Sequence, residues 1–487
     1  MRFKLIFSIT SLMLIICGVG MVIPGIADYI NHGKETATPF FLAGSFTVLC
    51  GLIFRKLFKT DPEPLRPKEM FLTTTLIWLV FALFSSLPFY FSKYDISFTD
   101  AFFESMSGLT TTGATIFTDL DTMDHGILLW RSLTQWFGGL GIIVVALTVL
   151  PSLHIGGMHF FTTESTEKSD KSAPKMAQTL RGIIYFFLLL SVLCAVCLWL
   201  AGMNIFDAIN HAMTTIATGG FSTKDASIGY FHNPAVEWVI TFFMAISGLP
   251  LIIGLLIAKR KWTTIKNDEQ IKTYFWVVFW SVLLLSLYRW HHASFGLDSF
   301  TTVLRTSIFS VISIVTTTGY ATENYMLWGN FAIVFFLMLL MTGACTGSTS
   351  GGIKMFRYSV LIKTIKTRMK SLMQPHGVFI PRYGEKPIND DMLIGIMVFI
   401  GLYFFSAGVL TLILSLFGLD LITCLSGAIA TISNVGPALG HMIGPDKTFA
   451  LMPDAAKWIL SFAMLLGRLE FITVIMVFFP YMWKRNI

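Results

Sequence analysis

The chain has 487 residues, of which 54% are hydrophobic and 13% charged, and its formal net charge is +7. Soluble proteins devote about 25% of their residues to charge, so this composition excludes an ordinary soluble domain and predicts a chain embedded in a bilayer. The Lys and Arg residues cluster at the ends of apolar segments. We therefore expect the cytoplasmic lipid surface as their partner, and no nucleic acid.

All six cysteines lie in apolar or pore-like stretches, which supports neither a disulfide framework nor a zinc site. Cys194 and Cys197 form a CxxC, but on a lipid-embedded helix this spacing is typical of packing residues. An intramembrane enzyme is disfavoured, because the chain has no Gly-x-Ser-x-Gly or His-Glu-x-x-His motif. We expect no enzyme activity and no bound cofactor.

The chain opens with Arg2, Lys4 and a long apolar run, a pattern shared by signal peptides and spanning helices. The run exceeds the usual signal-peptide length, so we interpret it as the first span. Apolar runs long enough to cross about 30 Å of hydrocarbon then predict ten spans in all. They lie near residues 4–27, 38–57, 70–92, 127–151, 181–203, 235–258, 273–290, 329–362, 392–417 and 456–481.

Basic residues gather in alternate loops, which predicts that these loops face the cytoplasm. The clusters contain Arg55, Lys56, Lys59, Arg66 and Lys68, then Lys168, Lys171, Lys175 and Arg181, then Lys259, Arg260, Lys261, Lys266 and Lys272, and finally the basic residues of 354–386. Both termini are then cytoplasmic. The expected location is the bacterial cytoplasmic (inner) membrane.

Four short, oxygen-rich stretches that end in glycine lie between apolar segments on the predicted outer side. We call them glycine stretches 1 to 4; they are residues 110–113, 217–220, 316–319 and 433–436. Thirteen residues before each final glycine stands a residue that can cap a helix N-terminus: Asp100, Asp207, Thr306 and Thr423. Each copy thus predicts a short helix of about three turns that enters the membrane and returns.

The four copies predict an all-α integral membrane protein with four helix–pore loop–helix units around one pore, plus two extra N-terminal helices. The expected divisions are 1–68 for the two N-terminal helices, 69–160 for pore repeat 1, 161–262 for repeat 2, 263–375 for repeat 3 and 376–487 for repeat 4.

Irregular backbone at membrane depth is tolerated only where protein or a water-lined cavity surrounds it. Carbonyl and Thr oxygens facing one axis can replace the hydration shell of a monovalent cation, and glycine permits the backbone angles that this needs. We therefore predict a potassium-binding selectivity filter. Its residues are Thr111, Thr112, Gly113, Thr218, Gly219, Gly220, Thr317, Thr318, Gly319, Asn434, Val435 and Gly436.

Acidic residues beyond three of the glycines are expected to concentrate cations at the outer mouth. They are Asp119, Asp121, Asp124, Asp225 and Glu323. The alternative interpretation of the Thr and Gly residues is close helix packing, as small residues allow in membranes.

The predicted span at 329–362 is too long for one straight crossing, and its middle is rich in small residues. We predict a gating loop within the membrane, formed by Gly343, Ala344, Cys345, Thr346, Gly347, Ser348, Thr349, Ser350, Gly351 and Gly352. The alternative is a flexible packing face. Arg468 lies in the last predicted span, where a charge needs protein or water around it. It could pair with Glu470 or Glu104, repel cations from the cavity, or hold the loop through its carbonyls.

The four stretches, the fourfold pattern, the two extra helices and the run at 343–352 together resemble the TrkH family, the membrane subunits of bacterial potassium uptake systems in the Trk/Ktr/HKT superfamily. The resemblance covers essentially the whole chain. It implies potassium passage through a single-chain pore, a homodimer, and control by a cytosolic nucleotide-binding ring of the TrkA type, which alone would bind nucleotide. It also favours loop contact as the role of Arg468.

Stretch 4 departs from the pattern, with Asn434 and Val435 where stretches 1 and 3 have Thr. We therefore expect weaker selectivity than in a symmetric potassium channel. Superfamily members with serine at the first filter-glycine position tend towards sodium, whereas this chain keeps Gly113, as well as the three later glycines.

A symporter that couples potassium to sodium or protons is the competing function, since Glu104, Glu237 and Glu470 offer intramembrane acids. The basic segment 363–386 predicts a cytoplasmic protein partner and, because of Pro375, Gly377 and Pro381, a shaped loop in place of a helix. The alternative there is lipid contact alone. His211 is interpreted as a hydrogen-bonding support, and His154 and His159 as interfacial residues.

Overall fold

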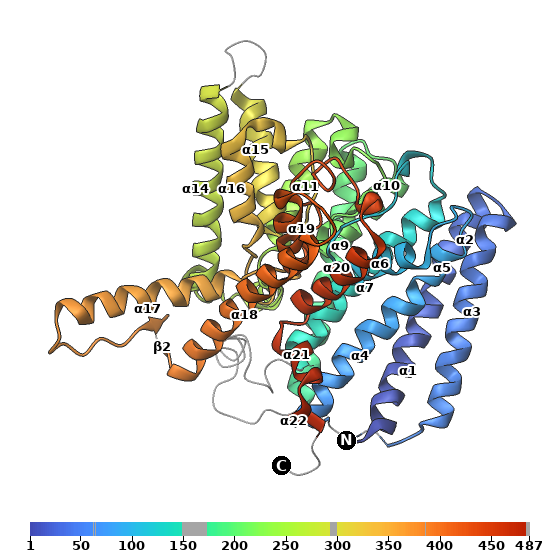
Figure 1. The fold of residues 1–487 in the computed structure, drawn as a ribbon, viewed down its shortest axis with the longest axis horizontal. Helices are drawn as coiled ribbons and strands as arrows, with labels where there is room; N and C mark the ends of the chain where they lie inside the picture. Colours follow the sequence, from blue (N-terminus) through green and yellow to red (C-terminus); the bar gives the residue numbers. More distant parts are fainter. Residues whose placement is uncertain (62, 64, 149–172, 293–299, 385, 484–487) are drawn as a thin grey trace.

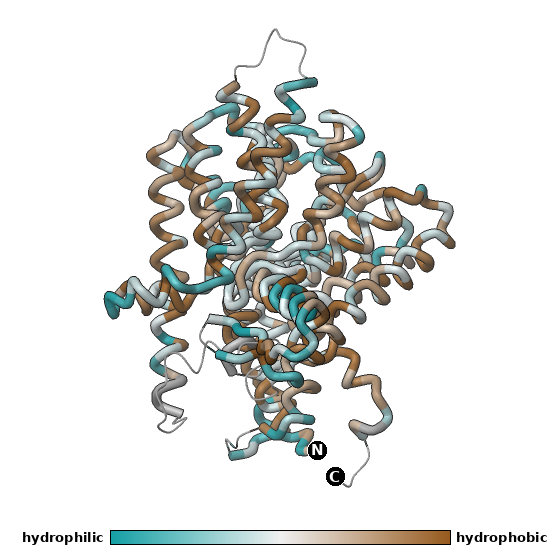
Figure 2. The backbone as a smooth tube through the Cα atoms, turned by 90° about the vertical axis from the view of Figure 1, so that its left-hand side faces the viewer, coloured by the Kyte–Doolittle hydropathy of each residue, from teal (hydrophilic) through white to brown (hydrophobic). Residues whose placement is uncertain are grey.

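The computed structural model describes residues 1–61, 63, 65–148, 173–292, 300–384 and 386–483. These residues form long helices joined by short helices and loops, together with one small β-hairpin (Figure 1). Hydrophobic residues cover the long helices, and hydrophilic residues gather at helix ends and connections (Figure 2). The predictions for Lys168, Lys171, His154 and His159, and the boundary between repeats 1 and 2, fall outside the described residues.

The three N-terminal helices pack together beside the rest of the fold. They are α1 (Phe3–Gly20), α2 (Val22–Asn31) and α3 (Lys34–Leu57). Gly18 of α1 faces the Gly44 carbonyl of α3 so closely that a Cβ on Gly18 would overlap it. Small residues thus allow the two backbones to approach, as is usual between membrane helices. The run Phe3–Asn31 is long and apolar enough to span, as the sequence predicted.

The remaining elements follow in chain order. First come α4 (Pro67–Ser85), α5 (Leu87–Tyr90), α6 (Phe98–Leu109), η1 (Leu120–Thr122) and α7 (His125–Thr148). Next are α9 (Ala173–Leu200), α10 (Ile205–Ile216), η3 (Ser227–Phe231), α11 (Pro234–Ser247), α12 (Ile253–Ala258) and α13 (Trp262–Asn267). Then come α14 (Glu269–His292), α15 (Phe300–Val315), η4 (Tyr325–Trp328), α16 (Asn330–Leu340) and α17 (Met355–Met373). The chain ends with β1 (Arg382–Tyr383), β2 (Lys386–Pro387), α18 (Asp390–Ser415), α19 (Leu421–Ser433), η5 (Phe449–Leu451), α20 (Asp454–Arg468), α21 (Ile472–Phe478) and α22 (Pro480–Trp483).

The prediction of ten spans is wrong in part. Among the described residues, seven helices are long and apolar enough to cross a membrane, or eight if the α20–α21 pair, bent by 118°, counts as one. The predicted span at 235–258 breaks between α11 and α12, which was not expected, whereas the one at 329–362 breaks between α16 and α17, as predicted. Both breaks lie against each other: Gly248 accepts a hydrogen bond from the Cys345 amide at 3.0 Å, and Gly347 accepts one from the Leu251 amide at 3.0 Å. Each break therefore supplies hydrogen-bond partners to backbone groups of the other.

The four helices α6, α10, α15 and α19, which we call the pore helices, precede the four glycine stretches. Their predicted starts are three or more residues too late. The side chains of Ser97, Asn204 and Asp420 cap α6, α10 and α19, each accepting a hydrogen bond from the amide three residues on. Those amides belong to Asp100, Asp207 and Thr423, the residues we had expected to be the caps. Thr306 lies well inside α15.

The segment at 363–386 is not simply a loop, because α17 continues to Met373. This helix extends sideways from the body of the molecule and does not continue α16 (Figure 1). Only the part after it, which contains Pro375, Gly377 and Pro381, is irregular and leads into the antiparallel pair β1–β2 with Tyr383 opposite Lys386. The prediction of a loop was wrong for the part up to Met373, because Pro375, Gly377 and Pro381 all follow the end of the helix and do not interrupt it.

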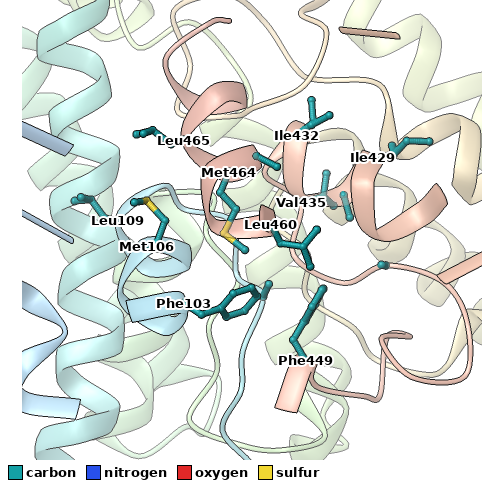
Figure 3. Close-up of a cluster of buried hydrophobic side chains, with 14 of the residues drawn as sticks. Phe103, Met106, Leu109, Ile429, Ile432, Val435, Phe449, Leu460, Met464 and Leu465 are labelled. Atoms are coloured by element: carbon teal, nitrogen blue, oxygen red, sulfur yellow. The ribbon is translucent and has the colours of Figure 1, made fainter. Parts of the chain in front are cut away.

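A large buried cluster joins the first and last repeats. Phe103, Met106 and Leu109 of α6 belong to the same buried cluster as Leu460 and Met464 of α20 and side chains of α19, and Phe103 lies beside Leu460 (Figure 3). All five side chains are at most 4% exposed. Packing between segments more than 300 residues apart in sequence thus closes the arrangement of pore helices into a ring.

Candidate ion pathway

All four pore helices end in the same hydrogen-bonded turn. In stretch 1 the Thr112 amide donates to the Ser107 carbonyl at 2.9 Å, while the Thr111 amide donates to Gly108. The same pair of bonds recurs at Gly219 and Thr218, at Thr318 and Thr317, and at Val435 and Asn434. This is the Schellman motif, in which a left-handed residue ends the helix and turns the chain sharply away from it.

The left-handed residues are Thr111, Thr218, Thr317 and Asn434, with φ values of 51°, 53°, 57° and 55°. A β-branched residue rarely adopts this region, and its strain costs on the order of 1–3 kcal/mol. Asn tolerates the same angles better than Thr. Asn434, which replaces the threonine of the other stretches, therefore allows stretch 4 to adopt the same backbone geometry as the other three stretches.

The four final glycines place the stretches in a closed ring. Gly113, Gly220, Gly319 and Gly436 have φ values of 85°, 77°, 81° and 92°. A Cβ added at each final glycine would overlap a carbonyl oxygen of the next stretch, and the contact made by Gly436 of stretch 4 leads back to stretch 1. We call these four oxygens the ring carbonyls; in the same order, they belong to Gly219, Thr318, Val435 and Thr112. The structure therefore brings all twelve predicted filter residues into one ring, at the ends of four inward-directed helices.

A cavity of about 770 Å³ opens at the glycine end of this ring. All four final glycines line it, as do Asp119, Asp225 and Asp446. The other acids expected at the mouth are paired with cations: Asp121 with Lys224 at 3.6 Å, Asp124 with Lys93 at 2.9 Å and Glu323 with Arg289 at 3.0 Å. Sequence alone did not identify Asp446. It also missed the cations in the lining, which include Arg131 and Lys447.

A polar side chain of each pore helix holds the segment that leaves its glycine stretch. Glu104 accepts from the Ile116 amide at 2.9 Å, and His211 lies 2.9 Å from the Ser222 hydroxyl. Ser313 donates to the Tyr320 carbonyl and Ser426 to the Leu439 carbonyl, each at 2.7 Å. The supporting role expected of His211 matches this arrangement.

The 342–352 loop lies on the helix side of the same ring. It is anchored at its base by a backbone bridge between Thr342 and Ile353, and at Thr346 by the buried Gln270 side chain, 3.0 Å from the Thr346 amide. Gly347 and Gly352 take φ values of 85° and 63°. The predicted interruption of the helix is thus present, and its backbone turns back within the fold.

The loop touches three of the four stretches directly. Thr349 and Thr218 share a hydroxyl hydrogen bond of 3.0 Å, and the Gly351 amide donates to the Thr317 hydroxyl at 2.7 Å. A Cβ on Gly351 would overlap the Ser433 carbonyl. The left-handed residues of stretches 2 and 3 are therefore in contact with the segment predicted to be the gate.

Arg468 ends α20 beside this loop and is 4% exposed. Its Nη1 donates to the Thr349 carbonyl at 2.7 Å. Neither acid named as its alternative partner pairs with it: Glu470 pairs with Arg357 at 2.7 Å, and Glu104 with Arg131 at 2.7 Å. A small cavity of about 40 Å³ is lined by residues of the loop, by Arg357 and by Arg468.

Comparison with known proteins identifies the family. The family model for TrkH cation transport proteins matches residues 38–485. The chain belongs to the TrkH family. It is 37% identical to the Trk system potassium uptake protein TrkI of Halomonas elongata, over 99% of this chain and 98% of that one, and 36% identical to TrkH of Salmonella typhimurium over the full length of both. The crystal structure of the potassium transporter TrkH from Vibrio parahaemolyticus superposes with a TM-score of 0.91 at 33% identity, and the match covers 99% of this chain and 100% of that one.

Membership of the TrkH family makes the chain a multi-pass membrane transport protein and not an enzyme. The six cysteines are free. Within the described ranges, no group of three or more His, Cys, Asp and Glu side chains could hold a metal ion.

Sequence reasoning about this TrkH-family chain overlooked Arg131 and Gln135 of α7. Both are buried, at 1% and 0% exposure, and both reach the segment around stretch 2. The Arg131 guanidinium donates to the Ser222 carbonyl at 2.8 Å, and Gln135 contacts Gly219 and Phe221. Arg131 and Gln135 are long polar side chains four residues apart on a largely apolar helix, and this was the available signal, since such spacing places them on one face.

Proposed function

We propose that this protein carries potassium across the cytoplasmic membrane through the ring formed by the four glycine stretches. The observation that supports this most directly is the repeated backbone geometry, which puts four equivalent carbonyl-rich turns around one axis. Relatives that match over the full chain are named as Trk system potassium uptake proteins. The twelve predicted filter residues are proposed to coordinate the ion, because carbonyl and hydroxyl oxygens suit a desolvated monovalent cation.

A gated, channel-like pore is favoured over a coupled symporter. The three acids that could have served coupling are each paired with an arginine: Glu104 with Arg131, Glu470 with Arg357, and Glu237 with Arg305 at 2.8 Å. The test is uptake of tracer rubidium into liposomes that contain only this protein. Uptake that needs no sodium or proton gradient supports the channel. Uptake that runs only with one of these gradients would make the protein a symporter.

The 342–352 loop and Arg468 are proposed as the gate below the filter. Contacts from the loop to stretches 2, 3 and 4, and from Arg468 to the loop carbonyl at Thr349, support this role. Because α17 begins three residues after Gly352, displacement of that helix would pull directly on the loop.

Partners of the Trk system are implied by the family, and we propose two in particular: a second copy of the chain, giving a homodimer, and a cytosolic nucleotide-binding subunit of the TrkA type. We also propose that both termini are cytoplasmic, since the start of α1 and α22 lie at the same end of the molecule (Figure 1). Recovery of a cytosolic subunit with the solubilised protein, with and without nucleotides, tests the second partner. Failure under every nucleotide condition would reject it.

A further inference from the structure

The ring is not supported equally on all sides. In stretch 1 the hydroxyls of Thr110 and Thr112 bond to each other at 2.7 Å, and in stretch 3 those of Thr316 and Thr318 do so at 2.8 Å. This bridge spans the left-handed residue between the two threonines. The bridge thereby holds the peptide group that carries the ring carbonyl (Thr112 in stretch 1, Thr318 in stretch 3) against the end of the pore helix that precedes it.

Stretch 2 lacks both hydroxyls, because Ala217 and Gly219 occupy the two positions. A Cβ placed on Gly219 would overlap the side-chain amide of Gln135, which reaches it from α7 of the preceding repeat. The Gln135 amide therefore fills the space that a threonine side chain would take at this position. It contacts the peptide that the missing bridge would have held.

The Gln135 amide also makes two hydrogen bonds, one on each side of Gly220. Its Nε2 donates to the Gly219 carbonyl at 2.7 Å, and its Oε1 accepts from the Phe221 amide at 3.1 Å. The partners fix the orientation of the amide, since a carbonyl needs a donor and an N–H group needs an acceptor. Among the described residues, the carbonyl of Gly219 is the only one of the four ring carbonyls that accepts a side-chain hydrogen bond.

We infer that Gln135 is a specificity-determining residue of the ion pathway, which positions the Gly219 carbonyl in place of the threonine bridge used by stretches 1 and 3. This inference rests on the proposed function of the ring as a potassium filter. A carbonyl that is held at a fixed distance discriminates between cations of different radius, whereas one that is free to move adapts to a smaller ion. Gln135 contributes through Gly219 and is therefore a positioning residue for the ligand.

The test compares rubidium with sodium flux in liposomes for the unchanged protein, Gln135→Met and Ser132→Ala. Met keeps most of the volume and removes both hydrogen bonds, each of which contributes about 1 kcal/mol. We expect a fall in the rubidium-to-sodium ratio of about tenfold, with folded protein retained. Ser132 is the matched control: it is buried on the same helix and its hydroxyl bonds only to the Leu128 carbonyl, one turn earlier. Its substitution should leave the ratio unchanged.

A rescue variant separates positioning from general support of the fold. Gln135→Ala combined with Ala217→Thr and Gly219→Thr replaces the amide with the bridge found in stretches 1 and 3. The combined variant should regain most of the preference lost in Gln135→Ala. Equal loss of rubidium and sodium flux in Gln135→Met, or a combined variant no more selective than Gln135→Ala, would overturn the inference.

Two outcomes distinguish this inference from the proposed function. If the unchanged protein shows no preference for rubidium over sodium, the filter itself is wrongly placed, and the inference falls with it. If the unchanged protein is selective and Gln135→Met is equally so, only the role of Gln135 is wrong. Should Gln135→Met fail to fold, Gln135→Glu provides the same measurement, because a carboxylate still accepts from Phe221 but cannot donate to Gly219.

Discussion

Replacing Arg468 by Ala should raise the basal flux of potassium through the protein without changing ion preference. The guanidinium donates one hydrogen bond to the Thr349 carbonyl, and Thr349 in turn contacts Thr218 and the Ile216 carbonyl. These contacts tie the 342–352 loop to α20 on one side and to stretch 2 on the other. Loss of Arg468 therefore releases the attachment of the loop to α20.

The size of the effect follows from that one bond. A hydrogen bond from a charged donor contributes about 1.5–3 kcal/mol, so its loss should shift the ratio of open to closed protein by roughly ten- to 150-fold. Among the described residues, Nε and Nη2 of Arg468 are buried and have no hydrogen-bond partner. The closed state therefore already carries a desolvation cost, and we expect a value towards the lower end of this range.

The assay is rubidium flux into liposomes from purified protein, with Ser461→Ala as the control. Ser461 is a buried residue of α20 whose hydroxyl bonds only to the Lys457 carbonyl of the same helix. Arg468→Gln separates two causes, since the amide can still donate to the loop but carries no charge. If charge alone blocks cations, Arg468→Gln should leak as much as Arg468→Ala. A lower flux in folded, dimeric Arg468→Ala would refute the gate and make the loop a conduction element.

Three further outcomes are expected. Gly113→Ser should reduce the potassium-to-sodium preference, and unchanged relative permeability would contradict the filter position. Because the Cβ of the new residue would overlap the Gly219 carbonyl, the substitution should also lower the thermal stability of the protein, an effect that the sequence did not suggest. Glu104→Gln should destabilise the fold by about 3–5 kcal/mol, because it leaves the Arg131 guanidinium buried without its carboxylate partner. The measurement is the melting temperature, which should fall; an unaltered value would show that the ion pair contributes little. Asn434→Ala should lower potassium selectivity, since its amide donates at 3.0 Å to the Thr112 hydroxyl and joins stretches 4 and 1; an unchanged potassium-to-sodium permeability ratio, measured in liposomes, would exclude that link.

The sequence by itself was enough to predict the architecture in outline. Apolar runs of spanning length and four stretches ending in glycine are local properties, because a helix must bury about 20 apolar residues in lipid and a sharp turn at its end needs special backbone angles. The same local logic located the break after α16, where small residues replace bulky ones.

Sequence could not fix features that depend on partners distant in the chain. The second break, between α11 and α12, occurs where the 342–352 loop supplies backbone hydrogen bonds to Gly248 and Leu251. The pairing of Glu104 and Glu470 with arginines removed two candidate partners of Arg468. Neither arrangement leaves a trace in local composition, because each depends on which side chains meet after the repeats close on one another.

The ring itself shows the division most directly. The final glycine of each stretch was readable from its position, whereas the left-handed turn at Thr111, Thr218 and Thr317 was not, because a β-branched residue rarely adopts that backbone region. Only the tertiary structure places Gly436 against the Thr112 carbonyl and Gln135 beside Gly219. The physical reason is that ion coordination requires oxygens from four separate segments at one point. That coincidence is produced by packing between helices, such as α6 against α20, whose residues stand hundreds of positions apart.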